Sequence, residues 1–133
     1  MTRATKFKSV AVREVVTQAL TVSTLSTAGV VAYTAAQVRG GLILRDPNGA
    51  GRADTLPTAA TLYTEFGYPE VGQSFKFVIR NTADAAETIT VSTATGLTLS
   101  GTMTIAQDNS KEFILRFDSP TAVTVYSVGT FVH

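Results

Sequence analysis

The residues with the clearest potential for chemistry lie in one polar stretch, residues 46–54. Three of its side chains carry oxygen atoms at spacings close to those of a calcium-binding loop: Asp46, Asn48 and Asp54. Ala50 stands at the fifth position of that motif and Pro57 at the twelfth, where a calcium loop places a ligand and a bidentate glutamate. The glycines here are not followed by the Gly-Lys-Ser/Thr of a phosphate-binding loop. We therefore expect a turn that holds neither a metal ion nor a phosphate group.

The start of the same stretch has a turn residue at every position: Asp46, Pro47, Asn48 and Gly49. In a type I turn, aspartate is favoured at the first position, proline fixes φ at the second, and glycine is favoured at the fourth. The sequence therefore predicts a structural type I turn here, after a short strand over residues 41–45.

Two pairs of carboxylates have the residue types that glycoside hydrolysis requires: Glu65 with Glu70, and Asp84 with Glu87. Each pair lies in or beside a predicted polar turn, where a solvated charge is the ordinary state, and nothing distinguishes an acid from a base within either pair. The chain has 0 cysteines, and its single histidine is the last residue, His133. A thiolate nucleophile, a histidine-based triad and a multi-histidine metal site are therefore not expected. We expect no catalytic residue, no cofactor and no metal ion, and hence a protein that is not an enzyme.

The composition favours strands. The 133 residues fit one domain, and 22 of them are threonine and 15 valine, which both prefer strands. The formal net charge of +1 combines a basic start with an acidic remainder: residues 1–52 carry seven basic and two acidic groups, and residues 53–133 carry four and eight. The basic residues are spread out and have no stacking aromatics between them, so we expect no nucleic-acid partner and instead expect contact with acidic protein surface.

Residues 1–36 hold short runs rich in valine and threonine, without a sustained period of 2 or of 3.6. Arg13 and Glu14 interrupt the place where the apolar part of a signal peptide would begin, and threonine and serine dilute the rest, so neither a signal peptide nor a membrane helix is expected. We interpret residues 1–36 as an extended N-terminal arm and residues 37–133 as the folded domain. Four basic residues of the arm are predicted to contact neighbouring subunits: Arg3, Lys6, Lys8 and Arg13.

Short strands separated by turn signals are predicted over residues 74–133. Their alternation predicts ten core residues: Phe75, Phe77, Ile79, Ile89, Val91, Leu97, Phe113, Leu115, Phe117 and Val125. One short helix is predicted over residues 58–66, because Pro57 precedes it, apolar residues follow at helical spacing, and Gly67 ends it. This pattern indicates an all-β, antiparallel sandwich or barrel with one short helix.

The chain resembles small virion proteins of tailed phages over about residues 40–130. The motifs that carry the resemblance, in order, are residues 40–50, Arg52, residues 54–60, 71–72, 75–77, 79–82, 97–101 and 123–126. The class that this resemblance suggests is the capsid decoration, or cement, protein. The resemblance implies a jelly-roll-like β-sandwich, a position on the capsid surface of the virion, binding to the major capsid protein, and assembly as a homotrimer.

A second hypothesis comes from another functional class. Three tyrosines have the side chains that line sugar-binding surfaces: Tyr63, Tyr68 and Tyr126. A carbohydrate-binding adhesin, or another tail or fibre module, is therefore kept as the alternative to a decoration protein.

Overall fold

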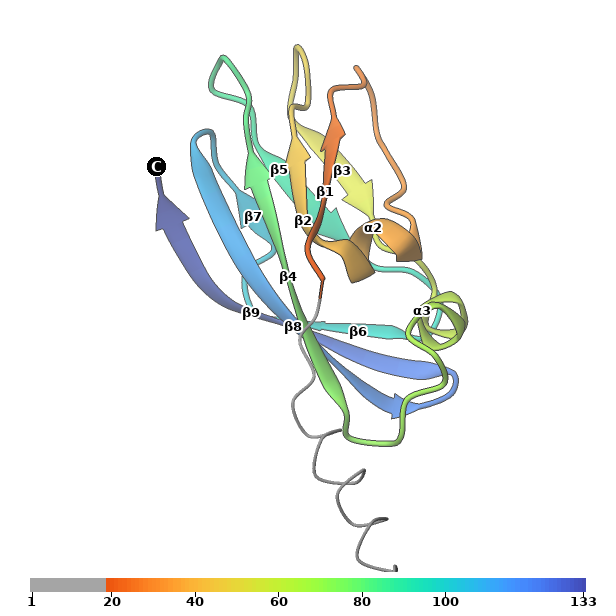
Figure 1. The fold of residues 1–133 in the computed structure, drawn as a ribbon. Helices are drawn as coiled ribbons and strands as arrows, with labels where there is room; N and C mark the ends of the chain where they lie inside the picture. The colour runs from red at the N-terminus through yellow and green to blue at the C-terminus, as the bar shows by residue number, and fades with distance from the viewer. Residues whose placement is uncertain (1–18) are drawn as a thin grey trace, which may run out of the picture.

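The computed structural model describes residues 19–133 and is mostly β-structure (Figure 1). A six-stranded sheet, here called the large sheet, has this order: β1 (Thr21–Leu25), β2 (Gly41–Arg45), β4 (Ser74–Asn81), β8 (Asn109–Ser119), β9 (Ala122–Val132) and β6 (Leu97–Ser100). A three-stranded small sheet has the order β3 (Arg52–Thr55), β5 (Ile89–Ser92) and β7 (Thr104–Ile105). Two short helices complete this part of the chain: α2 (Ala35–Gly40) and α3 (Ala59–Glu65). The predicted predominance of β-structure is confirmed.

Both sheets are mixed, which corrects the predicted antiparallel arrangement. Antiparallel pairing joins β4 to β8, β8 to β9, and β5 to β7. Parallel pairing joins β1 to β2, β2 to β4, β3 to β5, and β6 to β9. Parallel neighbours need a crossover connection rather than a tight hairpin, and α2 lies in the crossover from β1 to β2.

The predicted helix is confirmed and a second helix was not predicted. α3 begins after Thr58, whose hydroxyl oxygen accepts a hydrogen bond from the Thr61 N–H at 3.2 Å. It ends with the Gly67 N–H bonded to the Thr64 carbonyl and the Tyr68 N–H bonded to the Tyr63 carbonyl, the pattern of a Schellman motif. Gly67 has φ of 78°, which explains why glycine stands there.

The boundary predicted at residue 36 is wrong for the part of the arm that the structure describes. β1 lies within residues 19–36 and pairs with β2 over its whole length. Further along, Ala32 pairs with Thr55 of β3, and Tyr33 is buried. The strand-forming residues of this segment therefore belong to the chain's own sheets, with β1 paired on one side to β2, and do not form a free arm. The four predicted contact residues of the arm lie outside the described residues: Arg3, Lys6, Lys8 and Arg13.

One hydrophobic core is shared by both sheets and both helices. Eight of the ten predicted core residues are buried, and Phe75 and Leu97 pack against the core while partly exposed. Phe77 of β4 and Phe113 of β8 stack at its centre, with ring centroids 5.0 Å apart. The small sheet contributes Ile89, Val91 and Ile105, and the prediction did not include Ile105.

Candidate functional site

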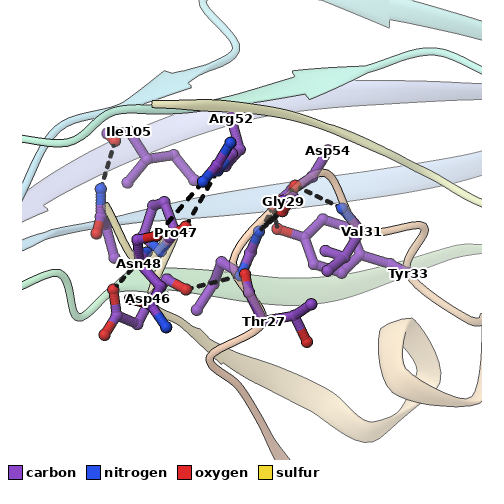
Figure 2. Close-up of polar contacts among 12 residues, drawn as sticks. Thr27, Gly29, Val31, Tyr33, Asp46, Pro47, Asn48, Arg52, Asp54 and Ile105 are labelled. Atoms are coloured by element: carbon purple, nitrogen blue, oxygen red, sulfur yellow. Dashed lines mark hydrogen bonds and ion pairs between the residues drawn. The ribbon is translucent and has the colours of Figure 1, made fainter. Parts of the chain in front are cut away.

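A buried arginine, Arg45, donates hydrogen bonds to four residues that Figure 2 labels: Thr27, Gly29, Asp46 and Asp54. Arg45 is the last residue of β2, and its side chain is 0% exposed. Its Nε donates to Asp54 Oδ2 at 2.8 Å, and Nη2 donates to Asp54 Oδ1 at 3.2 Å and to the Gly29 carbonyl at 2.6 Å. Nη1 donates to the carbonyls of Thr27 and Asp46, at 2.9 and 2.7 Å. These five hydrogen bonds equal the number of guanidinium N–H groups, so none is left for a ligand.

Asp54 of β3 is the partner of this arginine and is itself 0% exposed. Besides Arg45, its carboxylate accepts a hydrogen bond from the Val31 N–H at 3.0 Å and another from the Tyr33 hydroxyl at 2.8 Å. Burial, followed by the neighbouring Asp54 carboxylate, raises the pKa of Tyr33 well above its usual value. The group of Arg45, Asp54 and Tyr33 therefore fastens residues 27–33 to the sheets. We call this group the buried clamp.

The buried clamp gives Asp54 a role that sequence reasoning missed, since Asp54 had entered only as a possible calcium ligand. Its two oxygens are already occupied by donors, and its charge is matched by Arg45. Within residues 19–133, no group of three acidic or histidine side chains is placed to hold a metal ion. The sequence carries no sign of the clamp, because residues 27–33 approach Arg45 only through the packing of β1 beside β2.

The predicted turn at Asp46, Pro47, Asn48 and Gly49 is present but is not of type I. Asn48 has φ of 55° and Gly49 has φ of 101°, whereas a type I turn keeps φ negative at its third position. The Asn48 N–H bonds to Asp46 Oδ1 at 2.8 Å, and the Asn48 side-chain amide donates to the Ser26 carbonyl at 3.0 Å. Asparagine tolerates the left-handed region, and these two bonds hold it there, so the turn is structural.

The turn is also bonded to the loop that precedes β5. Gly49 N–H donates to Glu87 Oε1 at 2.6 Å. Arg52 Nε donates to the Pro47 carbonyl of the turn at 3.1 Å. Glu87 is 7% exposed, and its Oε2 atom has no hydrogen-bond partner in the described part of the chain. Asp84 is exposed. The members of this predicted carboxylate pair therefore have different surroundings, and Glu87 serves to join two loops.

The members of the other carboxylate pair also have different contacts. Glu65 of α3 forms an ion pair with Arg39 of α2, with Arg39 Nη1 and Glu65 Oε2 3.3 Å apart. The backbone N–H of Glu70 donates to the Gln73 side chain at 2.9 Å, within the loop between α3 and β4. Glu65 therefore joins α3 to α2, while Glu70 is exposed and takes part in its loop through its backbone.

The three tyrosines proposed for sugar binding do not lie on one surface. Tyr63 and Tyr68 meet edge to face, with ring centroids 5.4 Å apart, and Tyr63 also contacts Phe117 on the core side of the large sheet. Tyr126 lies on the opposite side of that sheet, where the Arg116 guanidinium is 5.5 Å from its ring centre. Of the three, Tyr68 is exposed, at 65%.

Two margins of the large sheet have backbone that no other described strand pairs. β1 is the first strand of the sheet, so one whole side of Thr21–Leu25 is open. At the other margin, β6 covers β9 over Val123 to Tyr126, which leaves residues 127–132 open. We call these the β1 margin and the β9 margin (Figure 1). Large apolar side chains are exposed on or beside them: Leu20, Val22, Val128, Phe131 and Val132.

A shallow hollow adjoins the β1 margin. Its lining consists of Ala19, Leu20, Gly40, Gly41 and Lys76. The lining has no acidic side chain and no nucleophile beyond the Lys76 amine, so it offers no pair of groups for acid–base or nucleophilic chemistry. Among residues 19–133, the two margins are therefore better candidates for interaction than this hollow.

Comparisons with known proteins do not place this chain in a family: no protein-family model, no curated protein and no solved structure matches it. Neither α2 nor α3, the helices of residues 19–133, has the length and apolar character needed to cross a membrane.

Proposed function

We propose that this chain is a structural virion protein that binds and stabilises a capsid lattice as a decoration protein. The observation that carries the proposal is the pair of open margins on the large sheet, which expose unpaired backbone and apolar side chains. Such margins bind other chains by strand addition, in which backbone hydrogen bonds provide affinity and side chains provide specificity. The motif order that resembles tailed-phage virion proteins supports the same function.

The polar groups of the interior support a structural role over a catalytic one. The buried clamp and the turn at Asp46 use their donors and acceptors to fix loops. The proposal therefore includes no enzymatic activity and no cofactor. Its partners are the major capsid protein and further copies of this chain as a homotrimer, and its location is the capsid surface. The arrangement of two sheets around one core is consistent with a β-sandwich. A jelly-roll topology is proposed from the resemblance alone.

Charge supports a role for residues 1–18 in this binding. They carry four basic residues and one acidic residue, whereas residues 19–133 carry seven basic and nine acidic residues. A basic segment attached to a body of opposite charge steers the chain towards acidic surface and mainly affects the rate of association. The alternative, a carbohydrate-binding adhesin or another tail or fibre module, has less support because Tyr126 is separated from Tyr63 and Tyr68 by the sheet.

The test is binding to capsids assembled without this chain. The full chain should sediment with such particles in a saturable manner, and the decorated particles should resist heat better than bare ones. A glycan array should show no binding. Absence of sedimentation with particles, together with specific capture by a glycan, would replace the proposal with the adhesin alternative.

A further inference from the structure

The two open margins of the large sheet belong to strands that run in the same direction. β1 is parallel to β2, β2 is parallel to β4, and the two antiparallel pairs from β4 through β8 to β9 restore the original direction. Figure 1 shows the arrowheads of β1 and β9 pointing the same way, at opposite margins of the sheet. A β1 margin placed against the β9 margin of another copy would therefore form a parallel pair and extend the sheet.

Neither margin has a charged residue or a proline, but the β9 margin contains a β-bulge at Val128, where Ser127 and Gly129 pair with Phe113 and Glu112. Residues 21–25 and 127–132 contain no charged residue and no proline, which are the common means of preventing edge-to-edge pairing. The two open stretches have similar lengths, five and six residues. Thr21, Val22 and Thr24 are exposed on β1, and all of residues 130–132 are exposed on β9. Both margins therefore have enough accessible backbone N–H and C=O groups to form a short pair of strands.

The apolar side chains of the two margins lie on the same face of the large sheet. Val22 is in register with Leu42 and Val78, on the face opposite the core. Phe131 is in register with Ser110, which pairs with Arg80 on that same outer face. Val22 is 47% exposed and Phe131 is 55% exposed. A sheet continued from copy to copy would bring these two side chains onto one surface, where each removes apolar area of the other from water.

We propose that copies of this chain associate head to tail, with the β1 margin of one copy adding in parallel to the β9 margin of the next. Each copy then uses one margin of each kind, so the contact is heterologous and closes into a ring when the rotation between copies allows it. This inference rests on the proposed function in one respect: it names the contact that builds the proposed homotrimer. A chain that decorates capsids as a monomer would disprove the head-to-tail contact and leave the decoration function standing.

Charge substitutions test the contact in solution. Val22→Lys and Phe131→Glu should each weaken self-association by about tenfold or more, because each places one unpaired charge in the joined sheet. The double variant should recover association, since every head-to-tail contact then pairs lysine with glutamate. In a two-fold contact the double variant would instead place like charges opposite each other and recover nothing. Val71→Lys, on an exposed side chain of a loop away from both margins, is the matched control and should leave association unchanged.

The measurement is light scattering over a range of concentrations, with circular dichroism to show that each variant is folded. The wild type should have a mass several times 14.0 kDa, and the single variants should return towards 14.0 kDa. A wild type that stays at 14.0 kDa at every concentration, or a double variant that stays dissociated, would overturn the proposal.

Cross-linking gives a second test that does not depend on charge. The chain has 0 cysteines, so Val22→Cys and Phe131→Cys introduce the only thiols. Four strand spacings separate β1 from β9 in one copy, or roughly 19 Å, which is beyond a short bis-maleimide. The double variant should give a ladder of covalent oligomers, and each single variant should give monomers. Dimers from a single variant, or no ladder from the double variant, would contradict the head-to-tail contact.

Discussion

At the scale of single residues, the buried clamp explains how a long irregular segment stays fixed. Asp54 accepts four hydrogen bonds while fully buried, and Arg45 donates five. A buried ion pair contributes little net free energy compared with apolar residues, but the loss of one partner leaves an uncompensated charge. The clamp therefore determines where residues 27–33 lie rather than supplying most of the stability.

The first prediction concerns this charge balance. Asp54→Ala should lower the free energy of unfolding by about 3–5 kcal/mol, because the Arg45 guanidinium is then buried without its partner. The double variant Arg45→Met, Asp54→Leu should lose less than Asp54→Ala alone. Urea unfolding measures both values. If Asp54→Ala lowers the free energy of unfolding by less than about 1 kcal/mol, the ion pair does not contribute to the stability of the fold.

The second prediction concerns alkaline pH and Tyr33. The folded-state pKa of Tyr33 is raised, first by burial and then by the Asp54 carboxylate. The unfolded chain releases this proton near pH 10 while the folded chain keeps it, so stability falls as the pH rises above about 10. Tyr33→Phe should lose about 1 kcal/mol at neutral pH, through one hydrogen bond, and should show a smaller further loss at alkaline pH.

The measurement is the urea midpoint of both proteins from pH 7 to pH 11. The comparison with Tyr33→Phe isolates the part due to this residue, because the lysines are unchanged. Parallel curves for the wild type and the variant would mean that Tyr33 ionises as freely in the folded chain as in the unfolded one.

At the scale of secondary structure elements, the third prediction separates the two parts of the N-terminal region. Deletion of residues 1–36 should prevent folding, because it removes β1, Tyr33 and the two carbonyls that Arg45 binds at Thr27 and Gly29. Deletion of residues 1–18 should leave a folded domain. At low salt, this domain should bind capsids more weakly than the full chain does. Circular dichroism and sedimentation with particles test the two deletions. A folded product from the longer deletion would restore the arm boundary at residue 36.

Local sequence patterns predicted where helices and strands form better than they predicted which strands pair. Proline, helical spacing and Gly67 were enough to predict α3, and alternation predicted β4, β8 and most of the core. α2 was missed although Thr34 and Gln37 form a capping box, with Thr34 N–H bonded to Gln37 Oε1 at 2.9 Å and Gln37 N–H bonded to Thr34 Oγ1 at 3.1 Å. Parallel pairing could not be predicted, because alternation shows which face is buried but not which strand lies beside which.

At the scale of the whole molecule, one core links both sheets, and the fourth prediction concerns its centre. Phe77→Ala and Leu115→Ala should each cost about 2–5 kcal/mol, through lost burial and the cavity left behind. Both residues are at most 1% exposed, and Phe77 stacks on Phe113. Thermal unfolding followed by circular dichroism measures the loss. A melting midpoint equal to that of the wild type in both variants would remove these residues from the core.

The candidate site, formed by the two open margins, also depends on the whole molecule. The sequence predicted a partner-binding protein without catalytic groups, but the open margins depend on the order of strands in the large sheet. That order places β1 and β9 at opposite margins of the sheet. β6 ends at Ser100, and the next residue, Gly101, lies close to Ser127 of β9. No local pattern in the sequence reveals such an edge, because whether a strand is covered depends on segments distant along the chain.

A decoration protein must bind the capsid lattice of an assembled particle. The most direct measurement is a pair of cryo-EM maps of the assembled particle, one with this chain and one without it. If this chain decorates the capsid, the first map should show added density on the outer capsid surface that fits the two sheets of residues 19–133, grouped in threes and in contact with the major capsid protein. Identical capsid surfaces in the two maps, or density for this chain confined to the tail, would contradict this proposal.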